Sequence, residues 1–259
     1  MNQCVGISFL PDATSSLSAN RNPIKRCTDG LKRAERHSLG RKESATNTTL
    51  RNAAAQGMQL HFMDRESYRR KETAETLTEL ESRFGRFFLI PEGGANENGM
   101  KGCMEIPKLL SENYSVICAA CGTGTTIAGI AAGASPGVTV IGFPVLKNGL
   151  FLEPAIQQML DHSGYTGNKN WALQCDYHFG GYAKTTPELS AFMQHVADTY
   201  GIPLDYVYTA KVFFGVFDLL DKSFFKPGAR ILIVHTGGLQ GNAGFDNKHL
   251  PVENRPVTQ

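Results

Sequence analysis

The hydrophobic pattern of this chain changes near residue 50. Beyond that point, short runs of apolar residues alternate with segments whose apolar side chains recur every three or four residues, the period of a helix. The apolar runs predict strands at residues 58–63, 87–91, 114–120, 138–143, 171–179 and 231–235. The helical period predicts helices at residues 50–57, 72–84, 102–110, 127–133, 153–161, 187–200 and 211–221. Strands that alternate with helices predict an α/β fold with a parallel sheet.

Residues 1–49 lack such a pattern. They are rich in Ser, Asn, Thr, Lys and Arg, and the few apolar residues after Leu10 follow neither the period of a strand nor that of a helix. Residues 24–39 could form a weak basic helix. The composition favours a disordered or poorly packed arm over that helix. We therefore expect residues 1–49 to be poorly ordered.

Composition narrows the possible functions. The 259 residues, of which 41% are hydrophobic, suffice for the core of one large domain or two smaller ones. A net charge of +2 gives no strong field that would attract nucleic acid or an acidic membrane. The apolar runs are far shorter than a bilayer span, and the start of the chain lacks the basic segment of a signal peptide. The six cysteines are scattered, which predicts free thiols in a reducing cytoplasm and no metal site.

The segment Cys-Gly-Thr-Gly-Thr-Thr at residues 121–126 lies between a predicted strand and a predicted helix. Its glycines, Gly122 and Gly124, allow a sharp turn and a close approach of the backbone to a ligand. The N–H groups at the start of the helix point towards such a ligand, and the helix dipole favours an anion. Hydroxyl donors are added by three residues, Thr123, Thr125 and Thr126.

Two well-known phosphate motifs do not match this loop. No Gly-Lys-Ser/Thr follows, as a Walker loop requires, and Ile127 stands where GxGxxG has its third glycine. The loop therefore favours a single phosphate over a nucleotide pyrophosphate. A tight strand-to-helix turn without a ligand is the alternative, and the loop taken alone leaves both open.

Two other glycine turns, at residues 92–96 and 236–241, also follow predicted strands. Loops that follow the strands of a parallel sheet gather at its carboxyl edge, where ligands bind. Three such turns in one chain therefore favour a ligand site over three unrelated turns.

Four segments, taken in order, carry a family resemblance. They are Ile-Pro-Glu-Gly-Gly-Ala-Asn at residues 90–96, the loop at 121–126, Tyr-Val-Tyr-Thr-Ala-Lys at 206–211 and Ile-Val-His-Thr-Gly-Gly-Leu-Gln-Gly at 233–241. Their order and spacing resemble the D-cysteine desulfhydrase and 1-aminocyclopropane-1-carboxylate deaminase family. These are pyridoxal-phosphate enzymes of fold type II, the tryptophan-synthase β fold, which often form dimers. The resemblance covers about residues 50–245.

The resemblance implies a role for individual residues. Tyr208 would lie near cofactor and substrate as a proton donor or orienting group, Thr209 would approach the pyridine nitrogen, and Tyr182 would be a second active-site tyrosine. The phosphate of pyridoxal phosphate would be held by Gly122, Thr123, Gly124, Thr125 and Thr126. The substrate pocket would be lined by Glu92, Gly93, Gly94, Asn96, Thr236 and Gly237. Read without the resemblance, the two tyrosines are ordinary half-buried residues and Glu92 is a helix cap or a partner of a backbone amide.

Thr209 resembles the desulfhydrase branch, because the deaminases of the family have Glu at the equivalent position. A carboxylate favours a protonated pyridine nitrogen, whereas a hydroxyl leaves that nitrogen largely neutral. A neutral ring is a weaker electron sink, which suits β-elimination with a good leaving group. The resemblance thus implies conversion of a small amino acid such as D-cysteine to pyruvate, ammonia and sulfide. Deamination of 1-aminocyclopropane-1-carboxylate is the alternative.

The lysine that the chemistry requires does not stand where the family has it. In the family this lysine, which holds the cofactor as a Schiff base, lies near the N-terminus in a Gly-Asn-Lys motif, and a Ser-Asn-His motif follows. Residues 17–21 are the nearest match, with Arg21 in place of the lysine. Arginine stays protonated and forms no imine, so nearby Lys25 is the remaining candidate. The predictions are a truncated or degenerate enzyme, a non-catalytic cofactor-binding protein, or a non-functional fragment.

The hydrophobic pattern and the family resemblance together predict the domain organisation. Residues 1–49 would be a poorly ordered or degenerate segment, and residues 50–83 the remnant of an incomplete small α/β domain. Residues 84–245 would form a large cofactor-binding domain with a parallel sheet in three layers, and residues 246–259 a tail.

Overall fold

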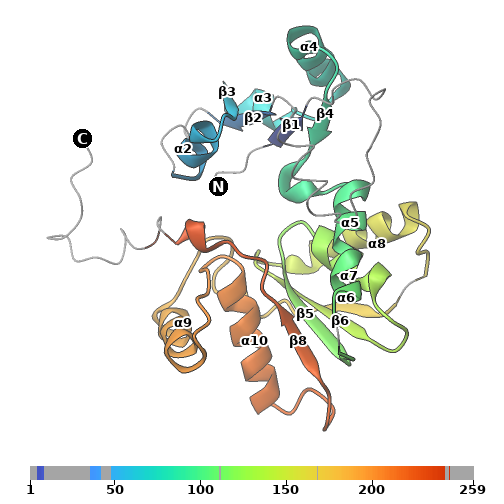
Figure 1. Ribbon diagram of the computed structural model, residues 1–259, viewed down its shortest axis with the longest axis vertical. Coiled ribbons are helices and arrows are strands. Elements are labelled where there is room, and N and C mark those ends of the chain that lie inside the picture. The colour runs from blue at the N-terminus through green and yellow to red at the C-terminus, as the bar shows by residue number, and fades with distance from the viewer. Residues whose placement is uncertain are drawn as a thin grey trace, which may run out of the picture. The chain divides into compact units, whose positions relative to one another are not determined.

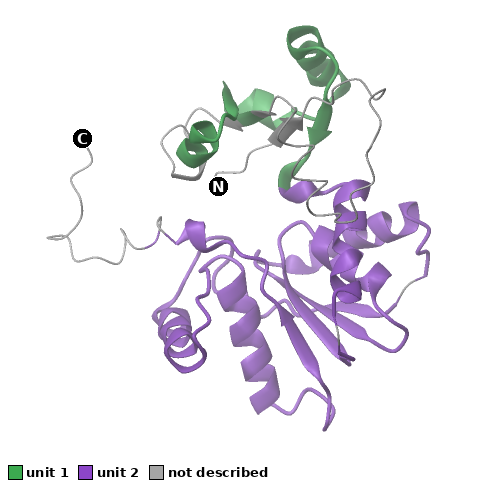
Figure 2. Cartoon of the chain, viewed as in Figure 1, with its two compact units in different colours: residues 1–92 green, residues 93–259 purple. Residues whose placement is uncertain are grey.

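The chain divides into two compact units, residues 1–92 and 93–259 (Figure 2). The computed structural model describes residues 5–8, 36–41, 48–110, 112–167, 169–242 and 245. The boundary falls inside the glycine turn that follows Glu92, whereas the sequence predicted it at residue 84. It lies later because the strand at residues 88–90 pairs with the sheet of the first unit.

The first unit contains a four-stranded sheet with the strand order β3-β2-β1-β4. Strand β1 pairs antiparallel with β2 and β4, and β2 pairs parallel with β3. The strands are β1 (Val5–Ser8), β2 (Arg36–Arg41), β3 (Gln59–Met63) and β4 (Phe88–Ile90). Two of them lie within residues 1–49, and the expectation that this segment as a whole is poorly ordered stays a prediction. Leu39 of β2 is 1% exposed and packs with Leu80, which gives that strand an apolar anchor.

Three helices accompany this sheet: α2 (Thr48–Ala55), α3 (Arg65–Arg69) and α4 (Ala74–Phe84). The hydroxyl of Thr73 accepts the N–H of Thr76, so α4 begins two residues after the predicted start. The helix ends at Gly85, whose φ of 75° other residues adopt only with strain.

The second unit contains a parallel sheet with the order β7-β6-β5-β8. Its strands are β5 (Val116–Cys121), β6 (Thr139–Pro144), β7 (Trp171–Leu173) and β8 (Ile231–Val234). Because all four strands run in one direction, the loops that follow them lie at one edge. Strand β7 is shorter than the predicted 171–179. Phe179 and Gly180 have φ values of 50° and 88°, which no strand accommodates.

Helices cover both faces of this sheet, so the unit has three layers (Figure 1). Helices α7 and α8 lie on one face and α9 and α10 on the other. The helices are α5 (Glu97–Cys103), α6 (Glu105–Lys108), α7 (Thr125–Gly133), α8 (Glu153–His162), α9 (Pro187–Tyr200) and α10 (Thr209–Asp221). Two 3-10 turns also belong to this unit: η3 (Gly149–Leu152) directly precedes α8, and η4 (Leu239–Gly241) follows β8. None of the helices in the described part of the chain combines the length and apolarity needed to cross a bilayer.

The helix predicted at residues 102–110 is two helices, α5 and α6, and starts earlier. Oδ1 of Asn96 accepts the N–H of Gly99 at 2.8 Å, which caps α5 directly after the glycine turn. Helix α5 also packs closely on α7: a Cβ added to Gly129 would lie 2.3 Å from Cβ of Cys103. The absence of a side chain at Gly129 therefore allows α5 to lie close to α7. Because the glycine turn at residues 92–96 directly precedes α5, the turn is held near α7 as well.

Candidate active site

The loop at residues 121–126 joins the central strand β5 to the N-terminus of α7. Gly124 is the N-cap of α7, with a φ of 90° and no side chain to bond the first-turn N–H groups. Such N–H groups have no acceptor within the helix and form a natural anion site. The hydroxyls of Thr123 and Thr125 form a hydrogen bond with each other at 3.0 Å, so one of them donates to the other and the pair keeps one hydroxyl proton for a ligand. The local geometry therefore matches a cradle for one phosphate group.

Glycines bring the neighbouring segments against this loop. A Cβ added to Gly93 would lie 2.8 Å from Cγ2 of Thr123, so the glycine turn before α5 contacts the loop. A Cβ on Gly122 would lie 3.2 Å from Cε1 of Tyr208. The loop after β5 thus meets both the second glycine turn and the start of α10, as its predicted position at the carboxyl edge requires.

Tyr208 and Tyr182 form a pair beside the loop. Their ring centroids are 6.1 Å apart and their planes are inclined by 78°. Burial raises the pKa of Tyr208, and a hydrogen bond with Tyr182 acts in the same direction. The Tyr208 hydroxyl therefore stays protonated well above neutral pH. Its role towards a ligand stays a prediction.

Asp205 organises the start of α10 and was missed in the sequence. It is 1% exposed, and its carboxylate accepts the N–H groups of Val207, Tyr208 and Thr209 at 2.8–2.9 Å. The Thr209 hydroxyl donates to the same carboxylate at 2.6 Å and accepts the Asp205 N–H at 2.7 Å. An Asp a few residues before an apolar helix is a capping signal that could have revealed it.

Thr209 is fully buried by these contacts. Its hydroxyl proton is committed to Asp205, so the structure shows it as part of the helix cap. The predicted approach of Thr209 to a pyridine nitrogen stays a prediction.

The third glycine turn, after β8, reaches the same cap. A Cβ added to Gly238 would lie 3.1 Å from Cγ of Asp205. His235 fixes this turn, because Nδ1 accepts the Gly237 N–H at 3.2 Å and Nε2 lies 2.9 Å from the Pro203 carbonyl oxygen. Thr236 is exposed. The loops after β5 and β8 therefore both contact the segment that caps α10, at Tyr208 and Asp205 respectively.

Glu92 belongs to the first unit, where it is already partnered. The hydroxyl of Tyr68 donates to Oε1 of Glu92 at 2.7 Å, and Nζ of Lys71 lies 3.4 Å from the same oxygen. The predicted role of Glu92 in a substrate pocket has no support from these contacts and stays a prediction.

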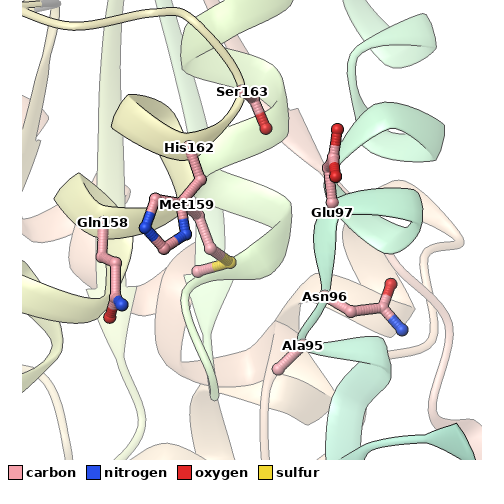
Figure 3. A pocket seen from close by; sticks show the side chains of 7 residues that line it. All are labelled: Ala95, Asn96, Glu97, Gln158, Met159, His162 and Ser163. Atoms are coloured by element: carbon pink, nitrogen blue, oxygen red, sulfur yellow. The ribbon is translucent and has the colours of Figure 1, made fainter.

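A pocket of about 280 Å³ lies between the start of α5 and the end of α8 (Figure 3). It is lined by Ala95, Asn96, Glu97, Gln158, Met159, His162 and Ser163. Asn96 is its one member among the predicted site residues. The loop at residues 122–126 and the tyrosine pair lie outside it, so we do not assign this pocket to the substrate.

Lysine is the residue type on which the predicted chemistry depends. Lys25 lies outside the described residues. The sequence also has Gly-Asn-Lys at residues 167–169, of which Lys169 shortly precedes β7 and so lies towards the amino edge of the sheet, opposite the loops after β5 and β8. A third lysine, Lys211 of α10, was given no role in the sequence analysis; it is fully buried, and burial lowers its pKa to about 8.

Cys118 and Cys121 of β5 are buried free thiols. Cys103 and Cys175, elsewhere in the described residues, are free thiols that are half-buried. Burial raises the pKa of Cys118 and of Cys121 to about 12. No cluster of three or more His, Cys, Asp or Glu side chains that could hold a metal occurs in the described part of the chain.

These thiols predict a loss of stability at alkaline pH. Because the pKa of Cys118 is higher in the folded chain than its ordinary 9.0, its contribution is complete below pH 9 and is lost as the pH rises towards 12. The destabilisation caused by Cys118→Ala should therefore shrink by about 1.4 kcal/mol per pH unit above that point. Urea unfolding of both proteins at increasing pH measures it. A difference independent of pH would show that the thiol ionises equally in both states.

Comparison with known proteins decides the family. The sequence model of the family described as pyridoxal-phosphate dependent enzyme matches residues 41–237. The chain belongs to this family. Pyridoxal phosphate is the family's cofactor, and the predicted α/β fold of this class is confirmed by a solved structure, an ACC deaminase homologue. That structure has a TM-score of 0.68 and 30% identity and is matched over 81% of this chain and 68% of its own.

Relatives of this pyridoxal-phosphate family member carry two kinds of name. The bifunctional D-cysteine desulfhydrase/1-aminocyclopropane-1-carboxylate deaminase of Arabidopsis thaliana is 32% identical over 206 residues, which are 71% of this chain and 51% of the relative. The D-cysteine desulfhydrase of Yersinia enterocolitica is 31% identical over 182 residues, 65% of this chain and 55% of the relative. The chain thus spans about half the length of these relatives.

Proposed function

We propose that this chain binds pyridoxal phosphate through its loop at residues 122–126. The observation that carries the proposal is the start of α7, where Gly124 leaves the first-turn N–H groups without a side-chain cap. Glycine at 122 and 124 keeps the cradle free of Cβ atoms, and the hydroxyls of Thr123 and Thr125 suit phosphate oxygens. These residues fit the phosphate of the family's cofactor.

The other residues of the second unit would surround the cofactor. Tyr208 would donate its retained proton to the substrate or cofactor, and Tyr182 would orient that hydroxyl. The turns at Gly93 and Gly237 would line the pocket together with Gly94, Asn96 and Thr236. When bound, pyridoxal phosphate stabilises negative charge that develops on the α-carbon of an amino acid.

The substrate that we propose is a small amino acid, and the reaction is a β-elimination of the D-cysteine desulfhydrase kind, giving pyruvate, ammonia and sulfide. The absence of a carboxylate at Thr209, where the deaminases have Glu, supports elimination over ring opening, although the Thr209 hydroxyl itself bonds Asp205. The names of the relatives support both reactions, so 1-aminocyclopropane-1-carboxylate is the second substrate to test. We also propose a reducing compartment such as the cytoplasm, consistent with the described free thiols, and a homodimer.

A non-catalytic cofactor-binding protein is the alternative, and one observation favours it. Lys211, the lysine one turn after Tyr208, has its amine bonded to backbone carbonyl oxygens and is closed to solvent. It is therefore unsuited to react with a cofactor aldehyde.

Binding measurements test the cofactor site. We expect pyridoxal phosphate to bind saturably and pyridoxal, which lacks the phosphate, to bind far more weakly. Thr123→Val should weaken the cofactor about tenfold, because one hydrogen bond to a charged group is lost. Thr139→Val, at the exposed start of β6, is the matched control and should have no effect. Equal affinity for pyridoxal and its phosphate would contradict the proposal.

Borohydride reduction separates the enzyme from the non-catalytic protein. A lysine that carries the reduced cofactor, located by mass spectrometry, would support the enzyme, and labelled Lys25 would identify the amine. Saturable binding without any labelled lysine would support the non-catalytic protein.

A further inference from the structure

Lys211 presents an ammonium group with three donors to three backbone carbonyl oxygens. Its Nζ lies 2.7 Å from the oxygen of Gly181, 2.9 Å from that of His178 and 3.5 Å from that of Val145. Val145 follows β6, and the other two residues lie in the loop after β7. One side chain of α10 therefore ties together the loops that follow two neighbouring strands.

The loop after β7 needs such a tie. Phe179 and Ala183, which are not glycines, have φ values of 50° and 52°, and Gly180 and Gly181 between them have 88° and 115°. A residue other than glycine in this region costs about 1–2 kcal/mol, so the loop is strained at both ends. Tyr182 lies inside this strained segment, and its ring meets Tyr208.

The charge of Lys211 suits this task. Burial disfavours the ammonium form, and the pKa of about 8 still leaves the side chain mostly protonated at neutral pH. The carboxylate of Asp205 acts on the pKa in the opposite direction and favours the charge. Hydrogen bonds from an ammonium to carbonyl oxygens are stronger than those between neutral groups.

We propose that Lys211 is a positioning residue whose ammonium serves as a built-in monovalent cation, holding the strained loop of residues 178–183, and with it Tyr182, against α10. The carbonyl oxygens of Val145, His178 and Gly181 are the ligands of this cation site. Truncation of the lysine side chain would leave those oxygens without their donor, beside a channel with the volume of the lost side chain that a small free alkylammonium ion could fill. The proposal concerns the backbone of the second unit and does not depend on cofactor binding.

Amide hydrogen exchange of the loop tests this role. The N–H of Gly181 donates to His178 at 3.0 Å and that of Lys184 donates to Gly181 at 3.2 Å, so both amides report the loop conformation. In Lys211→Ala and Lys211→Met we expect these amides to exchange at least about tenfold faster, with β5 and α9 unchanged. Lys222→Ala removes an exposed lysine at the end of the same helix and is the matched control.

Chemical rescue distinguishes the charge from the volume of the side chain. Ethylammonium should restore slow loop exchange in Lys211→Ala but not in Lys211→Met, whose side chain fills the channel without supplying a donor. Ethanol, a neutral molecule of similar size, should restore neither variant. If Lys211→Ala does not fold on expression, the yield of refolding in ethylammonium against ethanol gives the same comparison.

Three results would overturn the proposal. Unchanged loop exchange in both variants would show that the loop holds its conformation without the ammonium. Faster exchange throughout the second unit would show that Lys211 is only a core residue. Equal rescue by ethanol would show that filling space, and not charge, matters. The phosphate loop is tested separately, by the binding of pyridoxal phosphate to the unaltered chain, so the two proposals can fail independently.

Discussion

Replacement of Asp205 by alanine is expected to lower the free energy of unfolding by about 4 kcal/mol. The change removes an acceptor from three backbone N–H groups and from the hydroxyl of Thr209, all at distances of 2.6–2.9 Å. Asp205 is 1% exposed, so water cannot take its place without opening the start of α10. Four donors without an acceptor, of which the two on Thr209 are buried, cost far more than the loss of an ordinary surface cap.

Urea unfolding of Asp205→Ala measures this cost, and Thr186→Ala provides the scale. Thr186 caps α9 with one hydrogen bond of 3.2 Å, and its loss should cost only about 1 kcal/mol. Asp205→Asn keeps the shape and one acceptor oxygen, so its cost should lie between the two. If Asp205→Ala costs no more than Thr186→Ala, the four bonds to Asp205 together stabilise the fold no more than one ordinary capping bond.

Asp205→Ala should also change the candidate site, because the start of α10 contacts that site. Tyr208 owes its place beside Gly122 to the first turn of this helix, and Gly238 packs on the Asp205 carboxylate. Because the loops after β5 and β8 both contact the segment that caps α10, loss of the cap should disturb both. We therefore expect Asp205→Ala to weaken the binding of pyridoxal phosphate as well as the fold.

The alternation of strands and helices predicted the fold class because each period reports burial along one local element. It could not predict the division at Glu92, since that depends on β4 pairing with β1, a strand more than 80 residues earlier in the chain. It also extended β7 to residue 179. The apolar residues there pack in the core from a loop with positive φ, and apolar composition alone does not distinguish such a loop from a strand.

The candidate site could be predicted only where a local motif carries it. The glycine turns were found because glycine followed apolar runs. The turns after β5 and β8 lie at the carboxyl edge of the parallel sheet as predicted, whereas Gly93, which follows β4 of the other sheet, reaches Thr123 by a close backbone approach. Asp205 and Lys211 were not found as site residues, because their partners are mostly backbone atoms, and those of Lys211 lie 30–66 residues away. A lysine in an apolar helix is a signal only once those carbonyl oxygens are placed around it.

Gly124→Ala should have the second large effect, because two costs add at one position. The φ of 90° lies in the left-handed region, which costs alanine about 1–2 kcal/mol. The new Cβ would also lie 2.5 Å from Cγ1 of Ile156, a branch near the backbone that cannot turn away freely. Overpacking of this kind costs about 1–3 kcal/mol, so we expect a total near 4 kcal/mol. Relief of the clash would move the N-cap of α7 and thereby weaken phosphate binding.

Gly137→Ala separates the two costs of Gly124→Ala. Gly137 has a φ of 87° but no atom within 4 Å of an added Cβ, so it carries the backbone strain alone. In an Ile156→Ala background the contact is absent, and Gly124→Ala should then cost no more than Gly137→Ala. Chemical denaturation of the unaltered chain, Gly124→Ala, Ile156→Ala and the double variant gives the coupling energy between Gly124 and Ile156. If the coupling is zero, the loop relaxes without moving α8, and the close approach of Gly124 to that helix does not set the shape of the phosphate cradle.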